Sequence, residues 1–135
     1  MSERERALRL LPGRFAVCRL DPHAPLPAWA FHEDATFWSI TRTPDELSLV
    51  CDEDSVPPSV ERVEPGWRAI QVQGPIPFDE IGVLASLTTP LAEAGIPLFA
   101  LSTYDTDVVL VKQRDLERAL AVLRVRYRVE ATAPE

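Results

Sequence analysis

The stretch FALSTYDTDVVLVK, residues 99–112, places a polar segment between two apolar runs. Residues 98–101 and 108–111 are rich in aliphatic and β-branched side chains, and STYDTD (102–107) connects them. Two such runs joined by a short polar connection predict a β-hairpin. The connection lacks the Gly or Asn-Gly of tight hairpin turns and concentrates carboxylates, hydroxyls and a phenol. Such groups between two rigid strands favour a small-molecule site, and a solvated loop is the alternative.

Composition and charge restrict the class of partner. The chain has 135 residues, of which 46% are hydrophobic and 26% are charged, as is typical of one globular domain or two small ones. The formal net charge is −7, and the arginines and lysines are scattered rather than clustered. We therefore expect neither nucleic acid nor an anionic membrane as a main partner.

The N-terminus and the cysteines indicate a cytoplasmic protein. The first ten residues, MSERERALRL, alternate charged and apolar residues and do not form the hydrophobic segment of a signal peptide. No stretch approaches the roughly 20 apolar residues of a transmembrane helix. Cys18 and Cys51 show no spacing for zinc or redox chemistry, so we expect buried free thiols.

The first half of the chain predicts strands separated by a proline-rich loop. Residues 1–12 are expected to form a short helix or to be frayed. Pro22, Pro25 and Pro27 exclude regular structure in the loop that follows the first strand. The strands are expected at residues 14–20, 37–43 and 46–51, with a short edge strand at 59–64.

The second half predicts the order strand, helix, strand, strand, helix, strand, which is the ferredoxin-like βαββαβ pattern. Its outer strands are expected at residues 67–73 and 127–129, and residues 131–135 are expected to be a disordered tail. The first helix is expected to have Asp79 or a neighbour as N-cap, a kink or break at Pro90, and its end at Gly95. A second helix with one buried face is predicted by Leu116, Ala119, Leu120 and Leu123.

The first half appears again in the second as a longer copy. FWSITRTPDELSLVCDED (37–54) aligns with LFALSTYDTDVVLVKQRD (98–115) at an offset of 61, and GRFAV (13–17) aligns with GWRAI (66–70) at an offset of 53. The first copy is therefore shorter where the second has its first helix. We expect an α+β fold of two ferredoxin-like units packed together. The reduced unit, without its first full helix, is expected at residues 13–65 and the complete unit at residues 66–129.

Two segments resemble the tandem ACT-domain family. They are GPIPFDEIGVLASLTTPLAEAGIPLFALSTYDTDVVLVK (74–112) and WSITRTPDELSLVC (38–51). That family includes small bacterial ACT proteins, CASTOR-type arginine sensors and the ACT regulatory modules of aspartate kinases. The resemblance extends over residues 13–129. It implies a regulatory homodimer in which an amino-acid effector is held at an ACT–ACT interface.

The resemblance also implies which residues bind the ligand. The helix start corresponds to Ile81, Gly82 and Val83, and the polar strand-end motif corresponds to Thr103, Tyr104, Thr106 and Asp107. In the ligand-binding copy of the arginine sensors an aromatic residue stands where this chain has Thr106. The resemblance therefore does not extend to arginine as the ligand.

The same site follows from the geometry of a ferredoxin-like unit, in which the first helix starts near the end of the second strand. Free backbone N–H groups at residues 80–83 suit an α-carboxylate, and Gly82 allows a close approach. Asp105 and Asp107 suit an α-ammonium group or a basic side chain. The predicted ligand is an amino acid or a similar small zwitterion. The alternatives are an exposed strand-start carboxylate at Asp107 and a tight helix–sheet contact at Gly82.

No catalytic constellation, metal-ligand spacing or cofactor motif is recognisable. His23 and His32 lie in or just after the proline-rich loop, without a nucleophile or an orienting carboxylate in a motif. The acidic residues 52–54 lack the further oxygen ligands of an EF-hand and predict a solvated turn. We therefore expect a regulatory protein and not an enzyme. A structural or protein-interaction module with an ACT fold that has lost ligand binding is the alternative.

Overall fold

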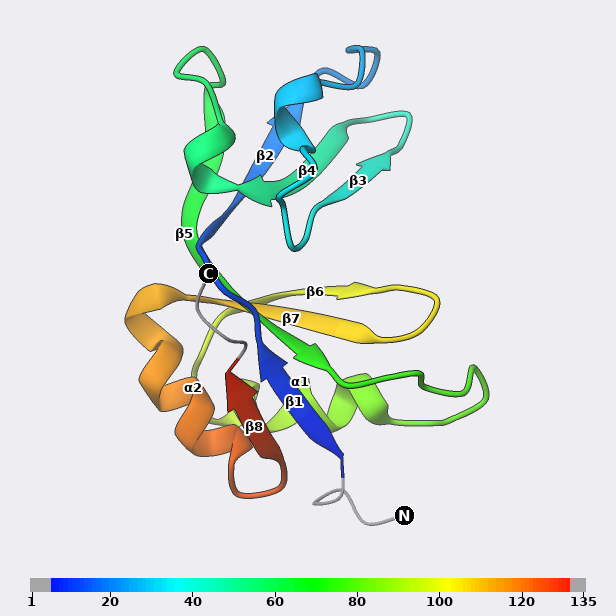
Figure 1. Ribbon diagram of the computed structural model, residues 1–135, viewed down its shortest axis with the longest axis vertical. Coiled ribbons are helices and arrows are strands. Elements are labelled where there is room, and N and C mark those ends of the chain that lie inside the picture. Colours follow the sequence, from blue (N-terminus) through cyan, green and yellow to red (C-terminus); the bar gives the residue numbers. More distant parts are fainter. Residues whose placement is uncertain (1–5, 132–135) are drawn as a thin grey trace. The chain divides into compact units, whose positions relative to one another are not determined.

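The computed structural model describes residues 6–131 (Figure 1). These residues form two compact units. The N-terminal unit is Gly13–Trp67, and the C-terminal unit contains the described residues before Gly13 together with those from Arg68 onward. One strand, β5 (Arg62–Val72), runs from the first unit into the second. No helix within the described residues is long and apolar enough to span a membrane.

The N-terminal unit is an antiparallel sheet with a long proline-rich loop between its first two strands. Its strands lie in the order β3-β4-β2-β5, where β2 is Phe15–Leu20, β3 is Ser39–Arg42 and β4 is Leu47–Asp52. The 3₁₀ helices η2 (Ala28–Ala30) and η3 (Glu53–Ser55) stand where a ferredoxin-like unit has α-helices. This is the reduced unit that the sequence predicts, because the proline-rich loop replaces the first helix.

The two cysteines lie in the core of the N-terminal unit. Cys18 and Cys51 are free and buried, which confirms the expectation from the sequence. They come from the paired strands β2 and β4. A hydrogen bond with the Cys18 thiol, together with burial, raises the pKa of Cys51. A thiol that stays protonated is a poor nucleophile and a poor metal ligand.

The acidic residues at the end of β4 and just after it are less solvated than the sequence predicts. Asp52 Oδ2 lies 3.0 Å from His32 Nε2, so this histidine has a carboxylate partner after all. Glu53 Oε1 accepts a hydrogen bond of 2.8 Å from the N–H of Gly66. Both contacts join residues that are distant in sequence and fold close together. Asp52 and Glu53 are half-buried, and Asp54 is exposed.

The strand β5 is continuous, although the sequence predicts two separate strands in this region. It runs from Arg62 to Val72 through Gly66, which has a φ of 81°. The pairing of β5 with β2 shifts its register between Phe15 and Val17. A glycine in the left-handed region accommodates such an irregularity without ending the strand.

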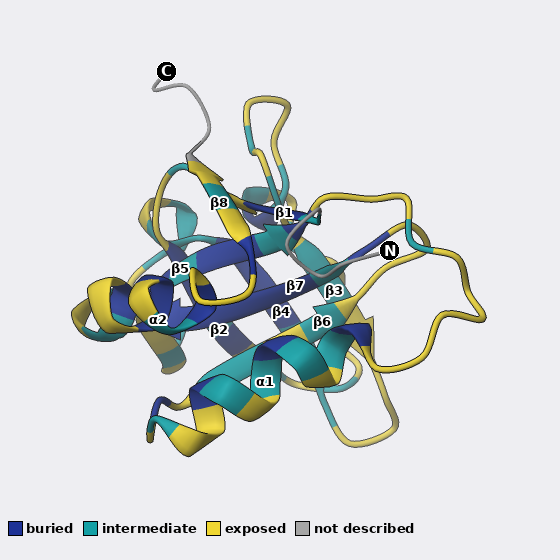
Figure 2. Cartoon of the chain, turned by 90° about the horizontal axis from the view of Figure 1, so that it is seen from below, coloured by how far each residue is buried: buried dark blue, intermediate teal, exposed yellow. Residues whose placement is uncertain are grey.

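The C-terminal unit is a sheet with two helices on one face. Its strand order is β6-β7-β5-β1-β8, and the further elements are α1 (Val83–Glu93), β6 (Leu98–Ser102), β7 (Asp107–Lys112), η4 (Gln113–Asp115), α2 (Leu116–Leu123) and β8 (Arg128–Ala131). The hairpin β6–β7 and the buried stripe of α2 confirm the sequence predictions. Both helices pack against the same sheet residues, which include Ile70, Val72 and Val109. Their buried and exposed positions lie on opposite sides in Figure 2.

The N-terminal segment is a strand and not the short helix or frayed end that the sequence suggests. The strand β1 (Ala7–Leu10) lies between β5 and β8, antiparallel to β5 and parallel to β8. Leu8 pairs with Val72, and Leu10 pairs with Ile70, so alternate residues of β1 extend the core face. Ala131, which was expected to begin a disordered tail, is instead the last residue of β8. The expectations for residues 1–5 and 132–135 lie outside the described residues.

The helix α1 differs from the sequence prediction at its start and at Pro90. Its N-cap is Gly82 and not Asp79, and the helix continues through Pro90. Leu87 and Leu91 are almost fully buried on either side of the proline, and their packing holds the helix together. The stop at Gly95 is confirmed, because Gly95 has a φ of 74° and the N–H of Ile96 donates to Leu91 O at 3.0 Å.

The hairpin turns of the two units correspond at an offset of 60 and not 61. The N–H of Thr43 donates to Glu46 O at 2.9 Å, and the N–H of Thr103 donates to Thr106 O at 2.8 Å. The register of β3 on β4 and of β6 on β7 agrees with this correspondence. A shift of one residue moves a side chain to the other face of a strand, so the alignment by residue type alone was wrong here.

Gly74 lies against the hairpin connection and leaves no room for a side chain. A Cβ at this position would stand 2.5 Å from Asp105 O, which also accepts a 2.7 Å hydrogen bond from the N–H of Ile76. We expect Gly74→Ala to lower the free energy of unfolding by about 1–3 kcal/mol, because the connection must move. Urea denaturation measures this change. An unchanged free energy of unfolding would contradict this expectation and show that the hairpin connection can move to admit a Cβ at residue 74.

Candidate ligand-binding site

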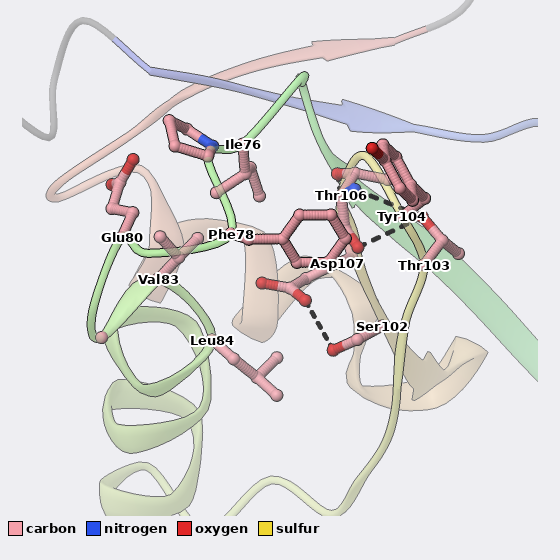
Figure 3. Close-up of a pocket in the computed structure, with 12 residues that line it drawn as sticks. Ile76, Phe78, Glu80, Val83, Leu84, Ser102, Thr103, Tyr104, Thr106 and Asp107 are labelled. Atoms are coloured by element: carbon pink, nitrogen blue, oxygen red, sulfur yellow. Dashed lines mark hydrogen bonds between the residues drawn. The ribbon is translucent and has the colours of Figure 1, made fainter.

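A cavity of about 290 Å³ lies between the start of α1 and the end of the β6–β7 hairpin. Its volume is close to the lower end of the range for small-molecule sites, about 300–1,000 Å³. Figure 3 shows the helix side with Glu80, Val83 and Leu84, and the hairpin side with Ser102, Thr103 and Tyr104. All lining residues belong to the C-terminal unit. They are Ile76, Pro77, Phe78, Glu80, Gly82, Val83, Leu84, Ser102, Thr103, Tyr104, Thr106 and Asp107.

The structure brings most, but not all, of the predicted site residues to this cavity. Gly82, Val83, Thr103, Tyr104, Thr106 and Asp107 line it. Ile81 does not, since its side chain is 96% exposed and borders a smaller neighbouring cavity. Asp105 borders a separate cavity of about 300 Å³ together with Arg9 and Gln73. An extended connection would direct both aspartates to one site. In the structure they border two different cavities.

The sequence did not indicate four lining residues from the segment before α1 and its first turn, or Ser102 as a partner of Asp107. The four are Ile76, Pro77, Phe78 and Leu84. Glu80 was predicted only as a free backbone donor, which is wrong, because its N–H donates to Pro77 O at 3.1 Å. The place of the four in the chain could have indicated them, because the segment that joins β5 to α1 must pass the tip of the hairpin. The N–H of Ile76 donates to Asp105 O at this point.

The start of α1 offers backbone donors to the cavity. Gly82 is the N-cap with a φ of 83°, and no side chain caps the helix. The first turn contains no acidic residue. The N–H groups of a helix start carry the positive end of the helix dipole and lack intrahelical partners. This wall of the cavity therefore suits an anionic group such as a carboxylate.

Asp107 supplies a carboxylate on the opposite wall. It is the first residue of β7, and its Oδ1 accepts a hydrogen bond of 2.6 Å from Ser102 Oγ (Figure 3). Ser102 and Asp107 face each other as a cross-strand pair of the hairpin. The hydroxyl therefore holds the carboxylate in one orientation, and Oδ2 remains to accept from a ligand.

Two threonines shape the turn between Ser102 and Asp107. Thr106 is buried, and its hydroxyl donates to Val72 O in β5. The N–H of Thr106 donates to Thr103 Oγ1 at 3.2 Å. The Thr106 hydroxyl is thus used inside the protein and ties the hairpin to β5. Thr106 forms part of the wall rather than a free polar contact for a ligand.

Two exposed aromatic rings stand at the mouth of the cavity. Phe78 is 75% exposed and Tyr104 is 78% exposed. Their ring centroids are 4.7 Å apart, with an angle of 88° between the ring planes. Edge-to-face pairs of this kind are favourable. In Figure 3 the Phe78 ring projects from the segment before α1 toward the hairpin, so it lies where a ligand would enter.

The fold and this cavity define a class of βαββαβ domains in which the start of the first helix faces the hairpin. The family model described as ACT domain matches residues 62–125, and a model of an N-terminal domain matches residues 13–59. Residues 62–125 therefore form an ACT domain.

Relatives of known structure or function are regulatory proteins or share the fold. The chain is 34% identical over 97 residues to cytosolic arginine sensor for mTORC1 subunit 1 of Bos taurus, over 64% of this chain and 30% of the sensor. A crystal structure of an Agobacterium tumefaciens protein has a TM-score of 0.88 and 40% identity, and the match covers 96% of each chain. The regulatory subunit of aspartate kinase from Thermus thermophilus has a TM-score of 0.57 at 12% identity, with 84% of this chain and 91% of that chain covered.

The match to the curated sensors is partial. The chain spans between 30% and 56% of the length of the first curated relatives. At 12% identity the aspartate kinase subunit shows a common fold alone. The named functions of these proteins, arginine sensing and regulation of a kinase, are regulatory and not catalytic. Their ligands and targets belong to those proteins.

Proposed function

We propose that this chain is a regulatory ACT protein that binds a free amino acid in the cavity between α1 and the β6–β7 hairpin. One observation carries the proposal: an uncapped helix start and an oriented carboxylate, Asp107, face each other across one ligand-sized cavity. The helix start receives the α-carboxylate, and Asp107 receives the α-ammonium group. In this arrangement Ile81 and Asp105 do not contact the ligand.

In this proposal the protein acts in the cytoplasm as a homodimer, and the ligand is held at an ACT–ACT interface between the two copies. The exposed rings of Phe78 and Tyr104 support this assembly, because a second copy would remove their surfaces from water. The sensor from Bos taurus is described as cytosolic, which supports the location. Sedimentation equilibrium of the purified chain tests the dimer, and a monomer at all micromolar concentrations would argue against it.

A thermal-shift screen against the twenty proteinogenic amino acids tests the binding function. A ligand at 100 times its Kd is expected to stabilise the fold by about 2.7 kcal/mol. A chain that keeps the ACT fold and has lost its ligand would show no shift with any amino acid at millimolar concentration. The polar, oriented lining favours the sensor over this alternative, since a purely structural hairpin does not need it.

A further inference from the structure

We infer that the cavity selects an amino acid with an uncharged, apolar side chain, and that the ion pair between Arg6 and Glu80 sets this selectivity. The inference rests on the proposed function, because it concerns the side chain of the ligand bound at the same site. It follows from the two charged side chains that line the cavity, one of which is already paired inside the protein.

The lining of the cavity carries two charged side chains, Glu80 and Asp107, and both are acidic. Glu80 has a partner. Arg6 Nη2 donates to Glu80 Oε1 at 2.8 Å and to Glu80 Oε2 at 2.6 Å. The Arg6 side chain is 16% exposed and the Glu80 side chain 36%, so the guanidinium group is partly shielded from water while the carboxylate stays open to it. The pair removes Glu80 as a free charge and leaves Asp107.

A zwitterionic amino acid matches the remaining charge without any contribution from its side chain. Its α-ammonium group compensates Asp107, and its α-carboxylate meets the N–H groups of the uncapped start of α1. An acidic side chain would find no free cation among the lining residues, and Asp107 would repel it. A basic side chain would need Glu80, which Arg6 already holds. In either case a charge would enter the site without a partner, which is unfavourable.

The walls beside these charged groups are apolar. Val83 is nearly buried, and Ile76 and Leu84 are half-buried and pack against the core of the C-terminal unit. Phe78 and Tyr104 add ring surface at the mouth. Aromatic rings accept a cation as well as an alkyl group, so the rings alone do not choose between them. The charge balance makes the choice, and the aliphatic wall gives an apolar side chain its contacts.

Isothermal titration calorimetry of the full chain with single amino acids tests the selectivity. The probes are Leu, Ile and Met as the apolar group, Lys and Arg as the basic group, and Asp and Glu as the acidic group. We expect the best apolar ligand to bind at least about tenfold more tightly than any charged one. Tighter binding of a charged amino acid would overturn the selectivity and leave the proposed function standing. Absence of binding by all twenty amino acids would overturn both.

The role of the ion pair is tested with Arg6→Gln, which frees the Glu80 carboxylate. The ratio of the Kd for Leu to the Kd for Lys is expected to rise by about tenfold or more, because the side-chain ammonium gains a partner. The matched variant Arg6→Gln/Glu80→Gln removes both charges and is expected to return the ratio to its wild-type value. A loss of stability would weaken all ligands together and leave the ratio unchanged. An unchanged ratio in Arg6→Gln would therefore show that the ion pair does not determine selectivity.

Discussion

Asp107→Asn is expected to reduce the stabilisation that the best amino-acid ligand gives to the wild-type chain to about half or less. The amide keeps the size of the side chain and still accepts from Ser102 Oγ, but it cannot form a charge-assisted hydrogen bond with an α-ammonium group. Loss of such a bond costs about 1.5–3 kcal/mol, which corresponds to an affinity roughly ten to more than one hundred times lower. The thermal shift at 100 times the wild-type Kd measures the loss.

Asp105→Asn is the matched control for this experiment. The two aspartates lie two residues apart, but Asp105 borders the other cavity with Arg9 and Gln73. The control is therefore expected to keep the full ligand-dependent shift. An intact shift in Asp107→Asn, or a loss in Asp105→Asn alone, would place the α-ammonium group elsewhere and contradict the proposed arrangement.

These two aspartates also show where a prediction from sequence reaches its limit. Alternation along an extended chain places residues 105 and 107 on one face. The connection is instead a turn closed by the N–H of Thr103 on Thr106 O, so the alternation begins only at Asp107. The strands on either side were predictable from their apolar runs. The direction of each side chain in the turn depends on hydrogen bonds that residue types alone do not specify.

Contacts over long sequence separations account for the other differences. The strand β1 has four residues, too few for a clear period, and its place is set by pairing with β5 and β8 far along the chain. The partner of Glu80 is Arg6, 74 residues earlier. By contrast, Gly95 and the buried stripe of α2 act through neighbours within one or two helical turns, and both were predictable. Local features of this fold thus follow from the sequence, while the electrostatics of the site follow from the packing.

Leu87→Ala is expected to lower the free energy of unfolding by about 2–5 kcal/mol. Leu87 is 1% exposed and lies in the core that α1 shares with α2 and the sheet. Its truncation leaves a cavity beneath the helix, but Leu87 is not among the residues that line the ligand site. The folded variant is therefore expected to bind the amino acid with nearly wild-type affinity. Urea denaturation without and with ligand measures both quantities.

Leu84→Ala, three residues earlier in the same helix, is the complementary control. Leu84 is half-buried and lines the site, so its truncation is expected to cost less stability than that of Leu87 and more affinity. The two leucines thus separate the support of the helix from contact with the ligand. If Leu87→Ala lost the ligand-dependent stabilisation while still folded, the position of the helix start would depend on the core beneath it. The site would then be a mobile element and not the preformed wall that the uncapped helix start and Asp107 describe.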